Sequence, residues 1–92
     1  MPKPDVSLVP PRVDQLPPFK VLLHNDDVND MLYVVDTIVD LTPHTRRRAA
    51  ELMLEAHTGG VALLLVTHKE HAELVRDQLR AKRLVASIEP DA

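Results

Sequence analysis

Proline is concentrated at one end of this 92-residue chain, and its distribution decides which part can fold. Six of the eight prolines precede Phe19. Proline fixes φ and donates no main-chain hydrogen bond, so such a segment favours an extended conformation over a helix or a central strand. We therefore expect a flexible, proline-rich arm over residues 1–18 and one small domain over residues 19–90.

Composition narrows the class of protein. With a net charge of -3, the chain lacks the excess of positive charge that binds nucleic-acid phosphates. Its one Phe and one Tyr provide few aromatic rings for base stacking. The absence of cysteine excludes disulfides and thiolate metal sites. The longest apolar run is far short of a bilayer span, and the first 18 residues lack the apolar stretch of a signal peptide. We expect a cytoplasmic monomer with no cofactor and with neither nucleic acid nor membrane as a partner.

Apolar spacing predicts the elements in the first half of the domain. Phe19, Val21 and Leu23 alternate with other residues up to His24, as in a strand with one buried face. Turn-forming residues 25–30 follow, and either Asn29 or Asp30 is placed to cap a helix. The apolar residues of that helix recur at helical spacing, at Met31, Val34, Val35, Ile38 and Leu41.

A threonine-proline pair separates this helix from a second one. Thr42 is expected to be the N-cap of the second helix, with Pro43 at its first position. The helix should run to about His57, because Gly59 and Gly60 supply a C-terminal stop. The continuous apolar run over residues 61–66 that follows is consistent with an interior strand.

The last part of the chain predicts one more helix and one more strand. Thr67 and Glu70 match a capping box, and the buried face of the helix consists of Ala72, Val75 and Leu79. Residues 84–89 alternate as a final strand, which Pro90 ends. The order β-α-α-β-α-β predicts an α+β two-layer sandwich with three helices on one face of a three-stranded, mostly antiparallel sheet.

A cluster of hydrogen-bond acceptors ends the first predicted strand. Asn25, Asp26 and Asp27 follow an apolar stretch, and His57 lies on a helical stripe that is otherwise apolar. Carboxylate, amide and imidazole groups beside the apolar wall of a pocket suit a ligand that carries a positive charge at one point and is hydrophobic just beyond it. A peptide's amino terminus fits that description.

Each of these residues also has an interpretation that needs no ligand. Asn-Asp-Asp after a strand is commonly a solvated turn. His57 would complement the carbonyl end of the helix dipole, and Met53 would be ordinary core. His68 and His71 lack a second pair of metal ligands, so we expect surface histidines and no metal site. Arg46 and its two arginine neighbours cannot share one helical face and should be solvated.

Catalytic signatures are absent from the sequence. There is no glycine-rich phosphate loop, no Gly-x-Ser-x-Gly elbow and no His-Glu-x-x-His motif. Asp26 and Asp27 are adjacent on an extended segment, so their side chains point apart and make a poor acid-base pair. We expect a binding module and not an enzyme.

The motifs together resemble the ClpS family of N-end-rule adaptors. The similarity is carried by residues 22–27, by Met31 with Tyr33-Val34, by residues 51–57 with Gly60, and by Glu70-x-Ala72-Glu73. It extends without a gap from about Phe19 to Val75. The resemblance implies the two-layer sandwich above, similar also to the ribosomal L7/L12 C-terminal domain. It further implies an adaptor that carries substrates with a destabilising N-terminal residue to a Clp ATPase-protease.

The resemblance also implies roles for particular residues. Asn25, Asp26 and His57 would hold the free α-amino group of the substrate by charge-assisted hydrogen bonds. Asp27 and Asn29 would line the pocket mouth or bond the peptide backbone. The pocket for the first side chain would be walled by Met31, which acts as a gate against β-branched residues, and by Val34, Met53, Ala56 and Leu84.

Substrate and partner follow from the same resemblance. Preferred substrates would begin with Leu, Phe, Tyr or Trp. Glu70 and Glu73 would dock the N-domain of a Clp AAA+ ATPase of the ClpA or ClpC type.

Some positions depart from the family's common pattern. Residues 28–30 replace Tyr-Thr-Pro, Ala56 stands where Val is frequent, and Val75 takes the place of a Lys that helps ATPase docking. The alternative function is therefore a non-catalytic protein-interaction module on the same scaffold with a lost or altered N-degron site or ATPase docking. A small hydrolase using Asp26 and His57 ranks last.

Overall fold

Alternation along the first strand sets the two faces of the sheet. The computed structural model describes residues 16–91, so most of the arm expected over residues 1–18 lies outside the described part. In β1 (Phe19–His24), Val21 and Leu23 are buried, whereas the other residues of the strand are half-buried. This confirms the strand and its buried face, because successive side chains of a strand point to opposite sides.

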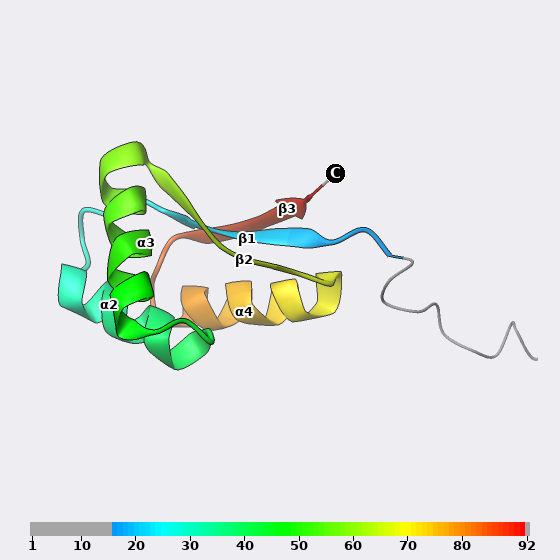
Figure 1. The fold of residues 1–92 in the computed structure, drawn as a ribbon, viewed down its shortest axis with the longest axis horizontal. Helices are drawn as coiled ribbons and strands as arrows, with labels where there is room; N and C mark the ends of the chain where they lie inside the picture. The colour runs from blue at the N-terminus through cyan, green and yellow to red at the C-terminus, as the bar shows by residue number, and fades with distance from the viewer. Residues whose placement is uncertain (1–15, 92) are drawn as a thin grey trace, which may run out of the picture.

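The sheet is fully antiparallel, with strand order β2-β1-β3. β1 pairs with β2 (Val61–Thr67) on one side and with β3 (Ala86–Pro90) on the other. The prediction that residues 61–66 form an interior strand is wrong: β1 occupies the centre, and β2 is an edge strand. Val61, Leu63 and Val66 are each 44% exposed because the helices cover only one sheet face (Figure 1).

A bulge interrupts the pairing of β1 with β2. Val21 faces Leu65 and Leu22 faces Leu63, so Leu64 is the extra residue. Its side chain is buried, and its carbonyl oxygen lies 2.6 Å from Nε2 of His44. The bulge thus places the Leu64 side chain in the core, and His44 provides a hydrogen-bond partner for the Leu64 carbonyl oxygen. A bulge on an edge strand also disfavours pairing of that edge with a strand of another molecule.

Three helices form the second layer. They are α2 (Met31–Leu41), α3 (Arg46–Gly59) and α4 (Lys69–Ala81). α3 packs on β2, α4 packs on β1 and β3, and α2 lies against both other helices. This arrangement confirms the predicted α+β sandwich (Figure 1).

The predicted starts of the second and third helices are wrong by a few residues. α3 begins after Thr45, whose hydroxyl accepts a hydrogen bond from the Arg48 main-chain N–H, and not after Thr42. Thr42 instead follows α2 and bonds back to the Ile38 carbonyl oxygen through both its main-chain N–H and its hydroxyl. α4 is capped by His68, whose ring accepts from the His71 N–H, and not by Thr67. Thr67 is still paired within β2.

The helix and strand ends near the C-terminus also differ slightly from expectation. α3 continues two residues past His57 and stops at Gly60, whose φ of 92° is readily adopted only by glycine. β3 begins at Ala86 and not at Leu84, because Leu84 lies in the turn that follows α4. Leu84 is nevertheless buried.

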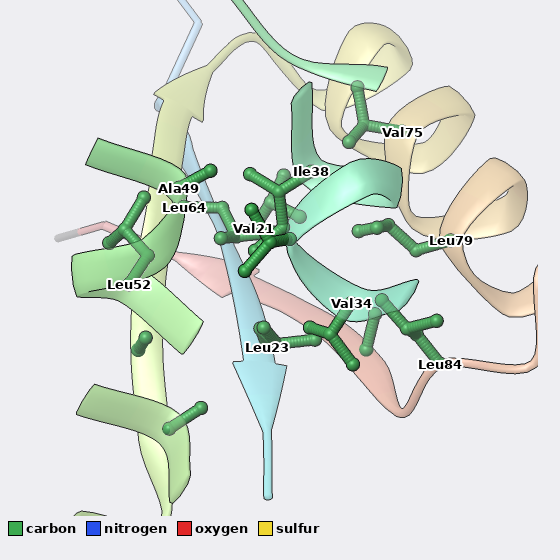
Figure 2. Packing of buried hydrophobic residues seen from close by; sticks show 14 of the residues in the cluster. Val21, Leu23, Val34, Ile38, Ala49, Leu52, Leu64, Val75, Leu79 and Leu84 are labelled. Carbon is green, nitrogen blue, oxygen red and sulfur yellow. The ribbon is translucent and has the colours of Figure 1, made fainter. Parts of the chain in front are cut away.

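The core lies between the sheet and the helices, as Figure 2 shows. Val21 and Leu23 from β1 meet Ile38 of α2 and Leu79 of α4, all 2% exposed or less. The predicted face of α4 is confirmed, since Ala72, Val75 and Leu79 are all buried. At the carboxyl end of β1 this core opens toward the acceptor cluster that the sequence singles out.

Candidate functional site

The loop between β1 and α2 is organised by the Asp26 carboxylate. One carboxylate oxygen accepts hydrogen bonds from the main-chain N–H of Val28 at 2.8 Å and of Asn29 at 3.4 Å. The other accepts from the Asn29 side-chain amide. The loop is also tied to the end of α3, because the Asn25 N–H donates to the Gly60 carbonyl oxygen at 2.9 Å. Asp26 therefore combines a negative charge with a fixed position.

These hydrogen bonds favour the charged form of Asp26. The Val28 N–H lowers the pKa of the Asp26 carboxyl below its ordinary value, with further lowering by Asn29 and partial opposition from burial. Asp26 is consequently a carboxylate at neutral pH. Such a group, half-buried beside an apolar wall, is suited to hold a cation.

The low pKa of Asp26 makes a stabilising contribution that depends on pH. A carboxyl whose pKa is depressed in the folded state stabilises the fold above its unfolded pKa of about 3.9. The contribution is lost as the pH falls through the lower, folded value. Urea unfolding of the wild type and of Asp26→Asn between pH 6 and pH 2 should show a stability difference that narrows below about pH 4. A difference that stays constant over this range would contradict the assignment.

An open pocket lies beside this loop, where β1, α2 and α3 meet the turn after α4. The space between its lining residues, including open solvent at the mouth, is about 330 Å³. Met31 and Val34 come from the first turn of α2, Met53 and Ala56 from α3, and Leu84 from the turn before β3. The complete lining consists of Leu23, His24, Asn25, Asp26, Asn29, Met31, Val34, Met53, Ala56, His57 and Leu84.

The structure brings nearly all of the sequence-predicted pocket residues together. The three acceptors Asn25, Asp26 and His57 lie on the same lining as the five apolar wall residues and Asn29. Asp27 does not line the pocket. It is exposed, and its carboxylate accepts only a long hydrogen bond of 3.5 Å from the Asn25 amide.

Two lining residues, Leu23 and His24, were not predicted as part of the site. Leu23 was predicted as core through its alternation in β1, and a core side chain at the end of a strand can also form a pocket floor. His24 bonds away from the acceptor cluster, since its Nε2 lies 2.7 Å from the Ser87 hydroxyl on β3. Both residues immediately precede Asn25 in the sequence, and from this position they could have been predicted to belong to the site.

The residues expected to dock an ATPase lie on α4, away from the pocket lining. Glu70 is exposed and Glu73 is half-buried. Val75 is only 1% exposed, so it packs in the core and is not part of any docking surface. This chain therefore presents no exposed side chain at that position. The effect of this departure from the family pattern on ATPase docking stays a prediction.

Other kinds of site find little support in residues 16–91. No group of three His, Asp or Glu side chains in this range gathers to hold a metal ion. His68 and His71 instead serve the start of α4, where the His71 ring lies 3.1 Å from the Thr67 hydroxyl. Within the same range, no helix is both long and apolar enough to cross a bilayer.

Comparison with known proteins shows which family the chain is similar to. Residues 14–87 match the family model of the ATP-dependent Clp protease adaptor protein ClpS. Similar proteins include the ATP-dependent Clp protease adapter protein ClpS of Gloeobacter violaceus, 43% identical over 77 residues that cover 83% of each chain. That of Synechococcus elongatus is 45% identical over 76 residues, covering 82% of this chain and 80% of the relative.

A solved structure shows the same fold. The structure of Agrobacterium tumefaciens ClpS2 bound to L-phenylalaninamide superposes with a TM-score of 0.77 at 22% sequence identity, covering 82% of this chain and 98% of the other. The sandwich with its acceptor-lined pocket defines a small adaptor-type binding domain. The chain belongs to the ClpS family of Clp protease adaptor proteins.

Proposed function

We propose that this protein binds the free α-amino group and the bulky apolar first side chain of substrate proteins and delivers them to a Clp ATPase-protease. The observation that carries the proposal is one pocket in which Asn25, Asp26 and His57 adjoin an apolar wall. An ammonium group retains its charge in such a site because acceptors replace its water, while the side chain beyond it meets apolar atoms.

The ligand of the similar Agrobacterium structure has this chemistry. L-phenylalaninamide combines a free amino group with an aromatic side chain. In this chain the equivalent first residue would be Leu, Phe, Tyr or Trp, placed against Met31, Val34, Met53, Ala56 and Leu84. Ala56 is 3% exposed and small, so it takes up less of the pocket than a larger side chain at this position would.

Delivery would use the exposed side of α4. Glu70 and Glu73 present negative charge there, which suits a basic surface on the N-domain of a ClpA- or ClpC-type ATPase. A reconstituted degradation assay tests delivery. A fluorescent reporter that begins with Leu should be degraded by the ATPase-protease only when this protein is added. Degradation that is unaffected by the protein, with either ATPase, would contradict the proposal.

Met31 is expected to act as the gate of the pocket. It is the first residue of α2, lines the pocket and remains 43% exposed at its mouth. Met31→Ala should remove the thioether that clashes with a branched β-carbon and raise the affinity for peptides beginning with Ile or Val about tenfold. A peptide panel measured by fluorescence anisotropy checks this.

The matched control for the gate is Leu32→Ala. Leu32 adjoins Met31 on the same helix, but it is 67% exposed and is not part of the lining. This variant should rank the peptides as the wild type does. An unchanged ranking in Met31→Ala as well would contradict the gating role.

A further inference from the structure

A single amide group connects the ammonium site to the opposite wall of the pocket. The Asn29 Nδ2 atom donates to the Asp26 carboxylate and also to the main-chain carbonyl oxygen of Arg83, at 2.9 Å. Arg83 lies 54 positions further along the chain, in the turn between α4 and β3. Asn29 therefore spans the gap between two segments that each contribute to the pocket.

The turn that Asn29 contacts has an unfavourable backbone conformation. Arg83 has φ of 69°, and it is the single non-glycine with a positive φ among residues 16–91. Such a conformation persists where the surroundings hold it in place. Here the main chain is held by hydrogen bonds from the Arg83 N–H to the Arg80 carbonyl and from the Leu84 N–H to the Leu79 carbonyl.

Two side chains from the pocket side add to this support. Besides Asn29, the Tyr33 hydroxyl donates to the Lys82 carbonyl oxygen at 2.8 Å. The residue that follows the supported turn is Leu84, which is 4% exposed and lines the pocket. The position of this wall residue thus depends on how the turn before it is held.

We propose that Asn29 is a positioning residue, which orients the Asp26 carboxylate toward the substrate's amino group and holds Leu84 in the pocket wall. This inference rests on the proposed function, because it assigns Asp26 and Leu84 to the peptide site. It differs from the role in which Asn29 bonds the peptide backbone. As a donor, Asn29 is fully used by the protein, because its amide nitrogen has two hydrogens and its two protein acceptors use both of them.

This chemistry requires an amide and not merely a polar side chain. A serine hydroxyl has one hydrogen and serves only one of the two acceptors. An aspartate has no donor when ionised and would place a second negative charge beside Asp26. Asn29→Ser should therefore lie between the wild type and Asn29→Ala, whereas Asn29→Asp should be at least as impaired as Asn29→Ala.

The control variant is Tyr33→Phe, which removes support from the turn without touching Asp26. Both Asn29→Ala and Tyr33→Phe should reduce the preference for a peptide beginning with Leu over one beginning with Ala, because that preference reports the apolar wall. Only Asn29→Ala should raise the pKa of Asp26 toward its ordinary value, as followed by carbon NMR of the carboxyl group, because Asn29 bonds the charged form.

Affinity completes the test. Asn29→Ala is expected to bind the Leu peptide about tenfold more weakly, as for the loss of hydrogen bonds to a charged group. Wild-type affinity and an unchanged Asp26 pKa in Asn29→Ala would overturn the positioning role and leave the proposed function standing. Failure of the wild type itself to bind the Leu peptide would overturn the proposed function. If Asn29→Ala does not fold, Asn29→Ser and Tyr33→Phe give the same comparison.

Discussion

Asp26→Ala is expected to weaken binding of a peptide with a free amino-terminal Leu by about 2 to 5 kcal/mol, the usual effect of truncating one partner of a hydrogen-bonded charge pair. The carboxylate is half-buried and lines the pocket beside Met31 and Val34. Without it, the ligand's ammonium would lose its charged acceptor. Isothermal titration calorimetry of wild type and variant with the same peptide measures the difference.

His57→Ala should have a smaller effect, of about 1.5 to 3 kcal/mol, as for a single hydrogen bond to a charged group. The smaller figure follows from the exposure of His57 in the last turn of α3, where water can replace part of the lost interaction. Neither substitution removes a residue from the apolar core, so both variants should keep the circular dichroism of the wild type.

Asp27→Ala is the matched control for charge. It removes the adjacent carboxylate, which is exposed and is not part of the lining. It should therefore change affinity by much less than Asp26→Ala, because its charge is screened by solvent and its one hydrogen bond to the site, from the Asn25 amide, is long at 3.5 Å. A large loss in Asp27→Ala combined with wild-type affinity in Asp26→Ala would show that the second carboxylate, and not the first, holds the amino group.

The second large effect concerns stability. Ile38→Ala should lower the free energy of unfolding by about 2 to 5 kcal/mol, because it leaves a cavity in a fully packed site. Ile38 is 0% exposed and lies on the face of α2 that packs into the core (Figure 2). Urea unfolding followed by circular dichroism measures the change.

Leu32→Ala provides the comparison on the same helix. Leu32 is 67% exposed, so its truncation removes little buried surface and should change stability by about 0.5 kcal/mol or less. Equal losses in the two variants would contradict the assignment of α2's buried face and, with it, the placement of Val34 in the pocket wall.

Local pattern predicted most of the fold because each element has one clearly apolar face. Val21 and Leu23 occupy alternate positions of β1. Ala72, Val75 and Leu79 recur at helical spacing on α4. These two patterns indicate directly which side chains are buried. Helix starts were harder, because Thr42 and Thr45 are both good caps and local sequence does not choose between them. The edge position of β2 was missed because an apolar run alone does not show which strand pairs on both sides.

The residues that line the site were predictable from local pattern and from the family resemblance, whereas the hydrogen bond that ties Asn29 to the turn after α4 was not. The acceptor cluster follows a strand directly, so residues 25–26 could be placed at the mouth of the core from sequence. The link from Asn29 to Arg83 joins positions far apart in the chain and uses a main-chain carbonyl, which no side-chain pattern reveals.

Fluorescence anisotropy of two labelled peptides that begin with Leu, identical except that one amino terminus is acetylated, tests the central claim most directly. Acetylation removes the positive charge and leaves the side chain intact, so it isolates the contribution of the acceptor cluster. We predict saturable binding of the free peptide and affinity at least about a hundredfold weaker for the acetylated one, as expected when a charged, hydrogen-bonded partner is lost. Equal binding of both peptides, or binding of neither, would contradict the assignment of this pocket to a free amino terminus.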